Sequence, residues 1–179
     1  GWHLMKKLAA ADRYGLPRPA IHQAYYSLAV RDFEWELMPL GLDQNVGTLV
    51  WSPLSGAKLS GKIGRNKRPP EGSRAATDAS WDVPEDRLFA ITDVLEAVSA
   101  ETGRSIPQVS LAWLLARPTV SGLIIGARNA EQLRDNLAAA DLKLTAEQIA
   151  RLDAASAVTP AYPYWHQQQS VPMRIPLPV

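Results

Sequence analysis

The chain has 179 residues and no cysteine, and its 19 Lys and Arg residues nearly balance its 18 Asp and Glu residues, for a formal charge of +1. The lack of cysteine excludes a disulfide scaffold, a thiol nucleophile and Cys-ligated metal sites. We therefore expect a cytoplasmic protein without a metal centre. The near-neutral charge gives no general attraction to nucleic acid or acidic membranes, and no apolar run reaches the roughly 18 residues that a membrane span needs.

The first 16 residues have the pattern of an amphipathic helix that lacks a capping residue at its start. Its apolar positions at helical spacing are Trp2, Met5, Leu8 and Ala9. Lys6 and Lys7 interrupt the apolar positions, so we expect no signal peptide. Because the helix has no start signal and the chain begins with Gly1, we expect further sequence before it.

Three short runs rich in β-branched, aromatic and other apolar residues predict strands at residues 21–27, 47–54 and 120–127. Residues 31–40, between the first two runs, have helical spacing that ends near Gly41. The third run is almost wholly apolar, which is typical of a parallel strand covered on both faces. These elements predict a parallel sheet.

Residues 55–81 are rich in Gly, Lys, Arg, Pro and Ser without periodicity, which predicts a long surface loop. Helix start signals follow, each a capping residue with Glu or Gln three positions later. The pairs are Asp82 with Glu85, Ser105 with Gln108, Asn129 with Gln132, and Thr145 with Gln148. Gly103 is expected to end the first of these helices. The apolar stripes of the first and third are Leu88, Ile91, Leu95 and Val98, and Ala130, Leu133, Leu137 and Ala140.

Alternating strands and helices predict an α/β fold with a parallel sheet. Three strands with two buried faces cannot close a sheet, whereas a (β/α)8 TIM barrel has about 250 residues. We therefore predict that residues 1–158 form the C-terminal part of such a barrel and that residues 159–179 form a tail wrapping the surface. Alone, the chain should expose an apolar sheet edge and associate with the missing N-terminal half or with another copy of itself.

The ends of the second and third strands carry candidate binding residues, because barrel active sites lie at the carboxyl ends of the strands. After Gly126, the side chains of Arg128, Gln132 and Asn136 share one side of a helix start, where an anion and a ring could bind. The alternative is a capped helix whose polar residues face water.

The second predicted strand also ends near an aromatic and a cationic side chain that could contact a ligand. Trp51 could stack on a cofactor ring and Lys62 could neutralise a phosphate, although a strand tryptophan is often a core residue. Gln23 is a polar residue within an apolar run, and a buried amide there would need a ligand or backbone partner.

The strings HQAYYSL at 22–28, WSPL at 51–54, LSGK at 59–62 and IGARNAEQL at 125–133, followed by Asn136, resemble the aldo-keto reductases. The resemblance is strongest to the branch that includes bacterial general-stress reductases and potassium-channel β-subunits, and it extends to about Ser156. It implies NADP-dependent reduction of aldehydes or ketones to alcohols. It also implies a small carbonyl substrate as the partner.

The resemblance implies that Gln23 holds the nicotinamide carboxamide and Trp51 stacks on the nicotinamide ring. Arg128 would pair with the 2′-phosphate of NADP, next to two adenine contacts from Gln132 and Asn136. Arg74 would lie in the segment that folds over the cofactor. The complete cofactor set is Gln23, Trp51, Ser52, Leu54, Gly56, Lys62, Gly126, Arg128, Gln132 and Asn136, of which Ser52, Leu54, Gly56 and Lys62 would line the pyrophosphate.

The catalytic Tyr, Lys, His and Asp of the family come from the first four strands, which this sequence lacks. We therefore assign no catalytic residue, and His3, His22 and His166 are interpreted as structural or surface residues. An alternative to the enzyme is a non-catalytic subunit that senses NADP with the same pocket. A phosphosugar-binding barrel is a third hypothesis, but it leaves Trp51 and Gln23 without a role.

Overall fold

The computed structural model describes residues 1–73, 76 and 83–170, and it has an α/β fold built on three parallel strands. The strands are β1 (Ile21–Tyr25), β2 (Gly47–Trp51) and β3 (Val120–Ile124), and β2 lies in the middle. The parallel sheet predicted from the sequence is confirmed. Each strand is shorter than predicted, and β2 ends because Ser52 adopts a left-handed backbone conformation with φ of 50°.

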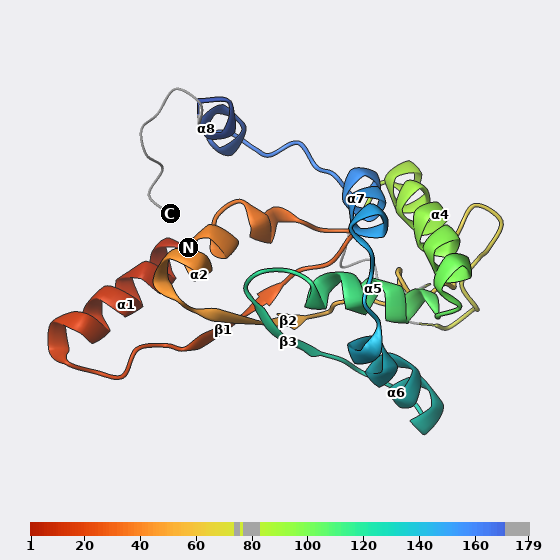
Figure 1. Ribbon diagram of the computed structural model, residues 1–179, viewed down its shortest axis with the longest axis horizontal. Helices are drawn as coiled ribbons and strands as arrows, with labels where there is room; N and C mark the ends of the chain where they lie inside the picture. The colour runs from red at the N-terminus through yellow and green to blue at the C-terminus, as the bar shows by residue number, and fades with distance from the viewer. Residues whose placement is uncertain (74–75, 77–82, 171–179) are drawn as a thin grey trace.

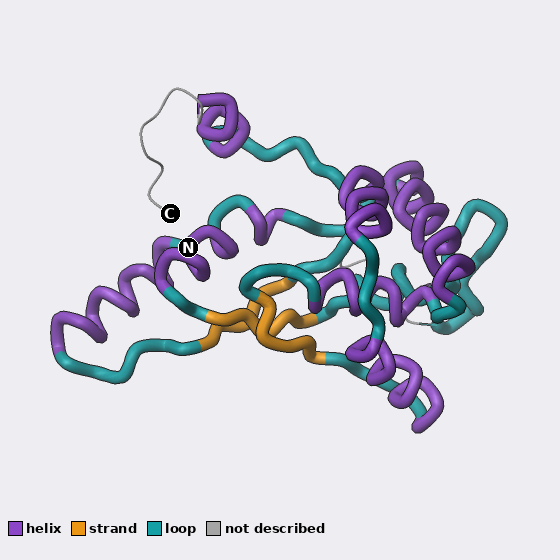
Figure 2. Tube along the Cα trace, in the orientation of Figure 1, coloured by secondary structure: helices purple, strands orange, loops and turns teal. Residues whose placement is uncertain are grey.

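The α-helices are α1 (Trp2–Tyr14), α2 (Leu37–Gln44), α4 (Glu85–Thr102), α5 (Ile106–Leu115), α6 (Ala130–Leu137), α7 (Ala146–Ala155) and α8 (Tyr164–Ser170), with 3-10 turns η1 (Asp32–Glu34) and η2 (Ala138–Asp141). In the view of Figures 1 and 2, α2, α4, α5 and α7 lie above the strands, α1 lies to their left and α6 lies at the lower right. Within the described ranges, none of these helices is long and apolar enough to cross a membrane. Residues 159–170 of the predicted tail include α8, and the rest of the tail lies outside the described residues.

Side-chain caps start three helices where the sequence predicted them. The side chains of Ser105, Asn129 and Thr145 each accept a hydrogen bond from the backbone N–H three positions later, at the starts of α5, α6 and α7. Gly103 ends α4 with φ of 64°, as predicted. The predicted cap Asp82 lies outside the described residues, and Pro84 is the residue before α4.

The helix predicted at residues 31–40 is wrong in its bounds. A 3-10 turn, η1, comes first, and α2 begins at Leu37 and continues through Gly41 to Gln44. Pro39 explains the shift, because proline has no N–H and is tolerated only in the first turn of a helix. A helix that started at Arg31 would place Pro39 in its interior. Asn45, in the left-handed region at φ 53°, ends the helix.

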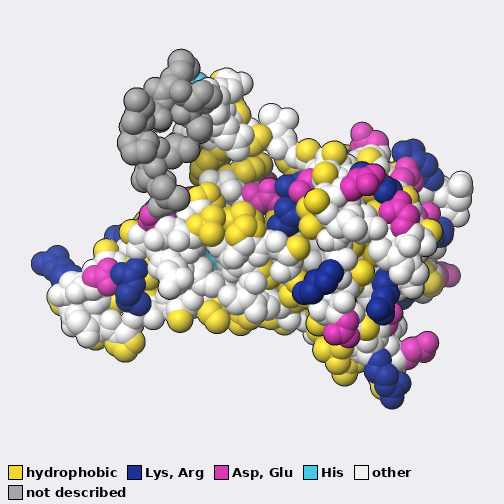
Figure 3. Space-filling view, viewed as in Figure 1, with side chains coloured by type: hydrophobic (Ala, Val, Ile, Leu, Met, Phe, Trp, Pro, Cys, Tyr) yellow, Lys and Arg dark blue, Asp and Glu magenta, His cyan; other side chains and the backbone are white. Residues whose placement is uncertain are grey.

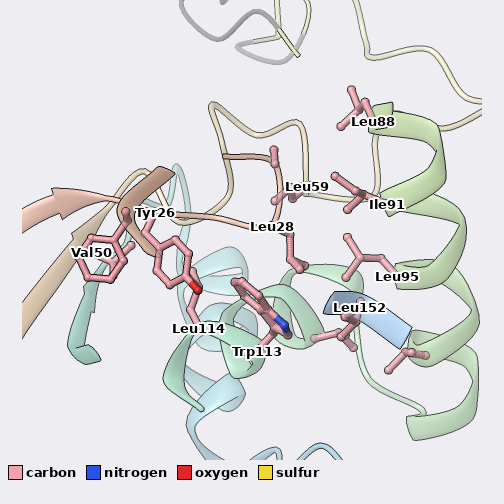
Figure 4. Close-up of a cluster of buried hydrophobic side chains, with 14 of the residues drawn as sticks. Tyr26, Leu28, Val50, Leu59, Leu88, Ile91, Leu95, Trp113, Leu114 and Leu152 are labelled. Atoms are coloured by element: carbon pink, nitrogen blue, oxygen red, sulfur yellow. The ribbon is translucent and has the colours of Figure 1, made fainter. Parts of the chain in front are cut away.

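The core lies between the helix-covered face of the sheet and α4, α5 and α7. Ala24 and Val50 point from the strands into this core, and the predicted stripe of α4 is buried on its far side. Figure 4 shows Val50 and Tyr26 beside Trp113 and Leu114, with the α4 side chains beyond them. The residues of that stripe are Leu88, Ile91, Leu95 and Val98.

The opposite face of the sheet is uncovered by the described residues. Gln23, Trp51 and Ile124 point to this face, and all three are exposed, Trp51 to 36% and Ile124 to 42%. The expectation that β3 is covered on both faces is therefore not met here, and the amide of Gln23 is exposed among the described residues. In Figure 3, hydrophobic side chains line the lower edge of the molecule between α1 and α6. The predicted stripe of α6 is also open, since Leu137 is 58% exposed, whereas the stripe of α1 is divided, with Trp2 60% exposed and Leu8 buried.

A charged cluster ties α7 to the segment after β1. Arg31 donates two hydrogen bonds of 2.8 Å to the carboxylate of Glu34 and others of 3.0 Å to the Asp153 carbonyl and the Ser156 hydroxyl. Burial by itself lowers the pKa of Arg31, but the hydrogen bonds and charge of Glu34 outweigh it and the net shift is upward. Burial and the hydrogen bond to Glu34 both raise the pKa of Tyr26. The cluster therefore favours a charged Arg31 beside a neutral phenol.

Arg31→Met in the complete polypeptide that carries residues 1–179 is expected to lower the free energy of unfolding by about 3 kcal/mol, because Glu34 loses its partner in a half-buried position. The control is Arg68→Met, whose pair with Glu85 is highly exposed and should contribute less than about 1 kcal/mol. Urea unfolding midpoints measure both variants. Equal urea midpoints for the two variants would contradict a larger contribution of the Arg31 cluster to stability.

Candidate functional site

A pocket of about 780 Å³ lies at the carboxyl ends of β2 and β3. It is bounded by the segment after β2, the start of α5 and the start of α6. Nine of the ten predicted cofactor residues line it: Trp51, Ser52, Leu54, Gly56, Lys62, Gly126, Arg128, Gln132 and Asn136. The tenth, Gln23, is not among the lining residues.

The parallel register explains why distant residues meet at this edge. Tyr25 pairs with Trp51 across β1 and β2, and Trp51 pairs with Ile124 across β2 and β3. Gln23 lies two positions before Tyr25 and therefore points to the same face as Trp51. It lies opposite Leu49, two register pairs before the pair formed by Tyr25 and Trp51.

Trp51 presents a half-open indole at the end of β2. One side of its ring packs against the ring of Tyr25, with centroids 4.9 Å apart and an interplanar angle of 29°. Its exposed fraction of 36% leaves indole surface toward the pocket, where a flat ring could stack. The alternative of a core tryptophan does not fit this exposure.

The segment after Trp51 winds through tight turns whose backbone is held in unusual conformations. Ser52, Ser55 and Ala57 all have φ between 50° and 72°, a region that L-residues other than Asn and Asp rarely adopt. The Gly56 N–H donates to the Ser52 hydroxyl at 3.3 Å, and the loop closes through further turn hydrogen bonds. Strained backbone of this kind is concentrated at ligand-binding sites.

The start of α6 is fixed by side-chain hydrogen bonds. The Gln132 N–H donates to the Asn129 side chain at 2.9 Å, and the Arg128 N–H donates to the Gln132 side chain at 3.0 Å. The amide of Asn136 donates to the Gly126 carbonyl at 3.4 Å, so it ties the helix to the end of β3. Gln132 and Asn136, which are predicted to contact the adenine, thus also fix the backbone around the start of α6.

Two cations line the pocket, and among the described residues neither Lys62 nor Arg128 forms an ion pair. The one carboxylate in the lining, Asp135, accepts hydrogen bonds from the Ser105 hydroxyl at 2.8 Å and from the Gln108 amide at 2.7 Å. Its charge is therefore directed toward α5. The pocket offers an aromatic face and two uncompensated cations, which suits a ligand with a ring and phosphates.

Sequence reasoning missed the contribution of α5. Ser105 and Pro107 at the start of α5 line the pocket beside Asp135 of α6, but the sequence identified only a cap in Ser105 and nothing in the other two. The hydrogen bond from Ser105 to Asp135 spans thirty positions, so no local pattern could reveal it.

The histidines lie away from the pocket lining. The ring of His22 hydrogen-bonds the Thr48 hydroxyl at 2.9 Å, and burial lowers its pKa, so it is a neutral structural residue at neutral pH. The described ranges contain no group of three or more His, Asp or Glu side chains that could hold a metal ion. Arg74 lies outside the described residues.

Comparison with known proteins gives an independent finding. The family model described as "Aldo/keto reductase family" matches residues 1–157. An uncharacterized oxidoreductase, YrpG, of Bacillus subtilis is 35% identical over 86% of the chain and 45% of its own length. A putative voltage-gated potassium channel subunit beta of Schizosaccharomyces pombe is 35% identical over 84% of the chain and 46% of its own length.

A more distant relative, norsolorinic acid reductase B of Dothistroma septosporum, is 25% identical over 91% of the chain and 41% of its own length. The chain spans less than half the length of these curated relatives. Because the family model covers residues 1–157, and a relative that is 35% identical matches 86% of the chain, the chain belongs to the aldo/keto reductase family of oxidoreductases.

Proposed function

We propose that this chain binds and orients NADP for the reduction of an aldehyde or ketone to an alcohol in the cytoplasm. The observation that carries the proposal is the convergence of Trp51, Lys62 and Arg128 on one pocket from three separate segments. Family membership supports the reaction class, and the two cations support a cofactor with several phosphates. The reduced nicotinamide supplies the hydride when the cofactor is bound.

Different residues of the pocket bind three parts of the cofactor, namely the nicotinamide, the pyrophosphate and the 2′-phosphate. Trp51 offers its exposed indole face to the nicotinamide and so fixes which face of that ring meets the substrate. The turns after Ser52, together with Lys62, bind the pyrophosphate through N–H groups and charge. Arg128 pairs with the 2′-phosphate, and its guanidinium can bind a phosphate in bidentate fashion.

Gln23 completes the nicotinamide end in this proposal. Its side chain points to the same face of the sheet as Trp51, two register pairs before it. An exposed amide there can donate to and accept from the carboxamide of the nicotinamide. The position on the open face is compatible with a polar side chain, whereas the neighbouring Ala24 points into the core.

We also propose that the sheet is part of a (β/α)8 barrel. Parallel sheets are almost always covered on both faces, yet the face with Trp51 and Ile124 is open among the described residues. The relatives are more than twice as long as the matched segment, which leaves room for the remaining strands. In a closed barrel the open face becomes the interior, and β1 and β3 find partners at both edges.

A second candidate is a subunit that senses NADP without turnover. It is favoured by the similarity to a protein of Schizosaccharomyces pombe named a putative voltage-gated potassium channel subunit beta, at 35% identity. The pocket would serve either role, because binding and orientation of the cofactor use the same residues.

Turnover separates the two candidates. The complete polypeptide that carries residues 1–179 is expected to oxidise NADPH steadily in the presence of simple aldehydes, monitored as loss of reduced-nicotinamide absorbance. A control with aldehyde but a Trp51→Ala variant should lose most of this rate. Tight NADPH binding with no turnover of any aldehyde tested would favour the sensor.

Arg128→Ala is expected to weaken NADPH binding by about 10- to 100-fold, the equivalent of one lost charge-assisted hydrogen-bonded pair, and to leave NADH binding little changed. Arg134→Ala is the matched control, because Arg134 is an exposed arginine on α6, the helix that begins just after Arg128, but lies outside the pocket lining. Titration with both cofactors measures the difference. Equal losses for NADPH and NADH would remove Arg128 from the 2′-phosphate.

Residues 1–179 purified alone are expected to self-associate, because the open sheet face and the exposed stripe of α6 remain without cover. Leu137→Lys, at a position 58% exposed on that stripe, should shift the isolated chain toward monomer. Sedimentation velocity measures both. A monomeric wild-type chain that unfolds cooperatively would contradict the incomplete barrel.

A further inference from the structure

Tyr25 contacts two parts of the candidate site without lining the pocket itself. Its ring stacks on Trp51, with centroids 4.9 Å apart, and its hydroxyl lies 2.8 Å from the hydroxyl of Ser55. It therefore links the aromatic platform to the turn segment, although thirty positions separate Tyr25 from Ser55 in the chain.

The position of Tyr25 follows from the strand register. As the last residue of β1 it pairs with Trp51, the last residue of β2, so both side chains stand next to each other on the open face of the sheet. The ring of Tyr25 occupies the β1 side of the indole. This contact limits the rotation of the Trp51 ring, because the indole cannot swing toward β1 without displacing Tyr25.

The other contact acts on a strained backbone. Ser55 is fully buried and has φ of 50°, next to Gly56 at 64° and Ala57 at 72°. A run of residues in this region persists only where surrounding contacts hold it. The hydroxyl of Tyr25 supplies one such contact from a rigid strand, and the Ser55 N–H adds another by donating to the Ser52 carbonyl at 2.8 Å.

We propose that Tyr25 is a positioning residue that fixes the nicotinamide platform through its ring and the pyrophosphate turn through its hydroxyl. The inference rests on the proposed cofactor function. The two contacts use different atoms of one side chain, so substitutions can separate them. Loss of the hydroxyl frees the turn, whereas loss of the ring also frees the indole.

Binding of two ligands to the complete polypeptide separates the effect of the Tyr25 hydroxyl from that of its ring. NADPH contacts both the platform and the turn, whereas 2′-phospho-ADP-ribose keeps the phosphates and adenine but has no nicotinamide. Tyr25→Phe retains the ring and removes the hydrogen bond to Ser55, so both ligands should bind about threefold to tenfold more weakly. Tyr25→Leu also removes the stacking, so NADPH should lose about a further threefold to tenfold while 2′-phospho-ADP-ribose loses no more than in Tyr25→Phe.

Two further variants test the route through Ser55 and the specificity of the change. Ser55→Ala should reproduce Tyr25→Phe, and the double variant should be no weaker than either single variant, because both remove one hydrogen bond. Tyr14→Phe and Tyr14→Leu are controls, since Tyr14 is 66% exposed on α1 and outside the pocket lining. Urea midpoints check that each variant folds.

The outcomes distinguish this inference from the proposed function. Wild-type polypeptide that binds neither ligand would overturn the proposed function and this inference with it. Wild type that binds both ligands while Tyr25→Leu weakens them equally, or weakens neither, would overturn the positioning role alone. Additive losses in the Tyr25→Phe and Ser55→Ala double variant would also overturn it.

Discussion

Parallel pairing of the three strands is the constraint on which the rest of the structure depends. Strands that run in one direction end at one edge, so the segments after β2 and β3 open onto the same space although about seventy positions separate them in the chain. The register then places Tyr25, Trp51 and Ile124 in one row. Trp51 and Ile124 of that row line the pocket, and the segments that follow them supply much of the remaining lining.

Predictions from the sequence were accurate where the determining forces are local. The caps at Ser105, Asn129 and Thr145 and the stop at Gly103 depend on a few neighbouring residues, and the structure confirms them. The helix at 31–40 was wrong because hydrophobic spacing was given more weight than the position of Pro39. Each predicted strand was too long, because apolar composition continues into turns such as the one that begins at Ser52.

The site was predicted mainly through resemblance, and its local patterns alone left a capped helix or a core tryptophan as alternatives. The structure gathers the predicted residues, except Gln23, around one pocket, while the role of each stays a prediction. The share of α5 could not be predicted, since Asp135 reaches Ser105 and Gln108 only through the tertiary fold. The amide of Gln23 is exposed, because the described residues do not cover that face of the sheet.

In the proposed function, the two faces of the sheet divide stability from binding. The covered face carries Ala24, Val50 and the aromatic core, and behind it the Arg31 cluster anchors α7 to the segment after β1. The open face carries Gln23 and Trp51 beside the pocket. Because side chains alternate between faces along each strand, adjacent residues such as Ala24 and Tyr25 serve different purposes. Strand sequence can therefore change on one face to suit a ligand while the core on the other face stays packed.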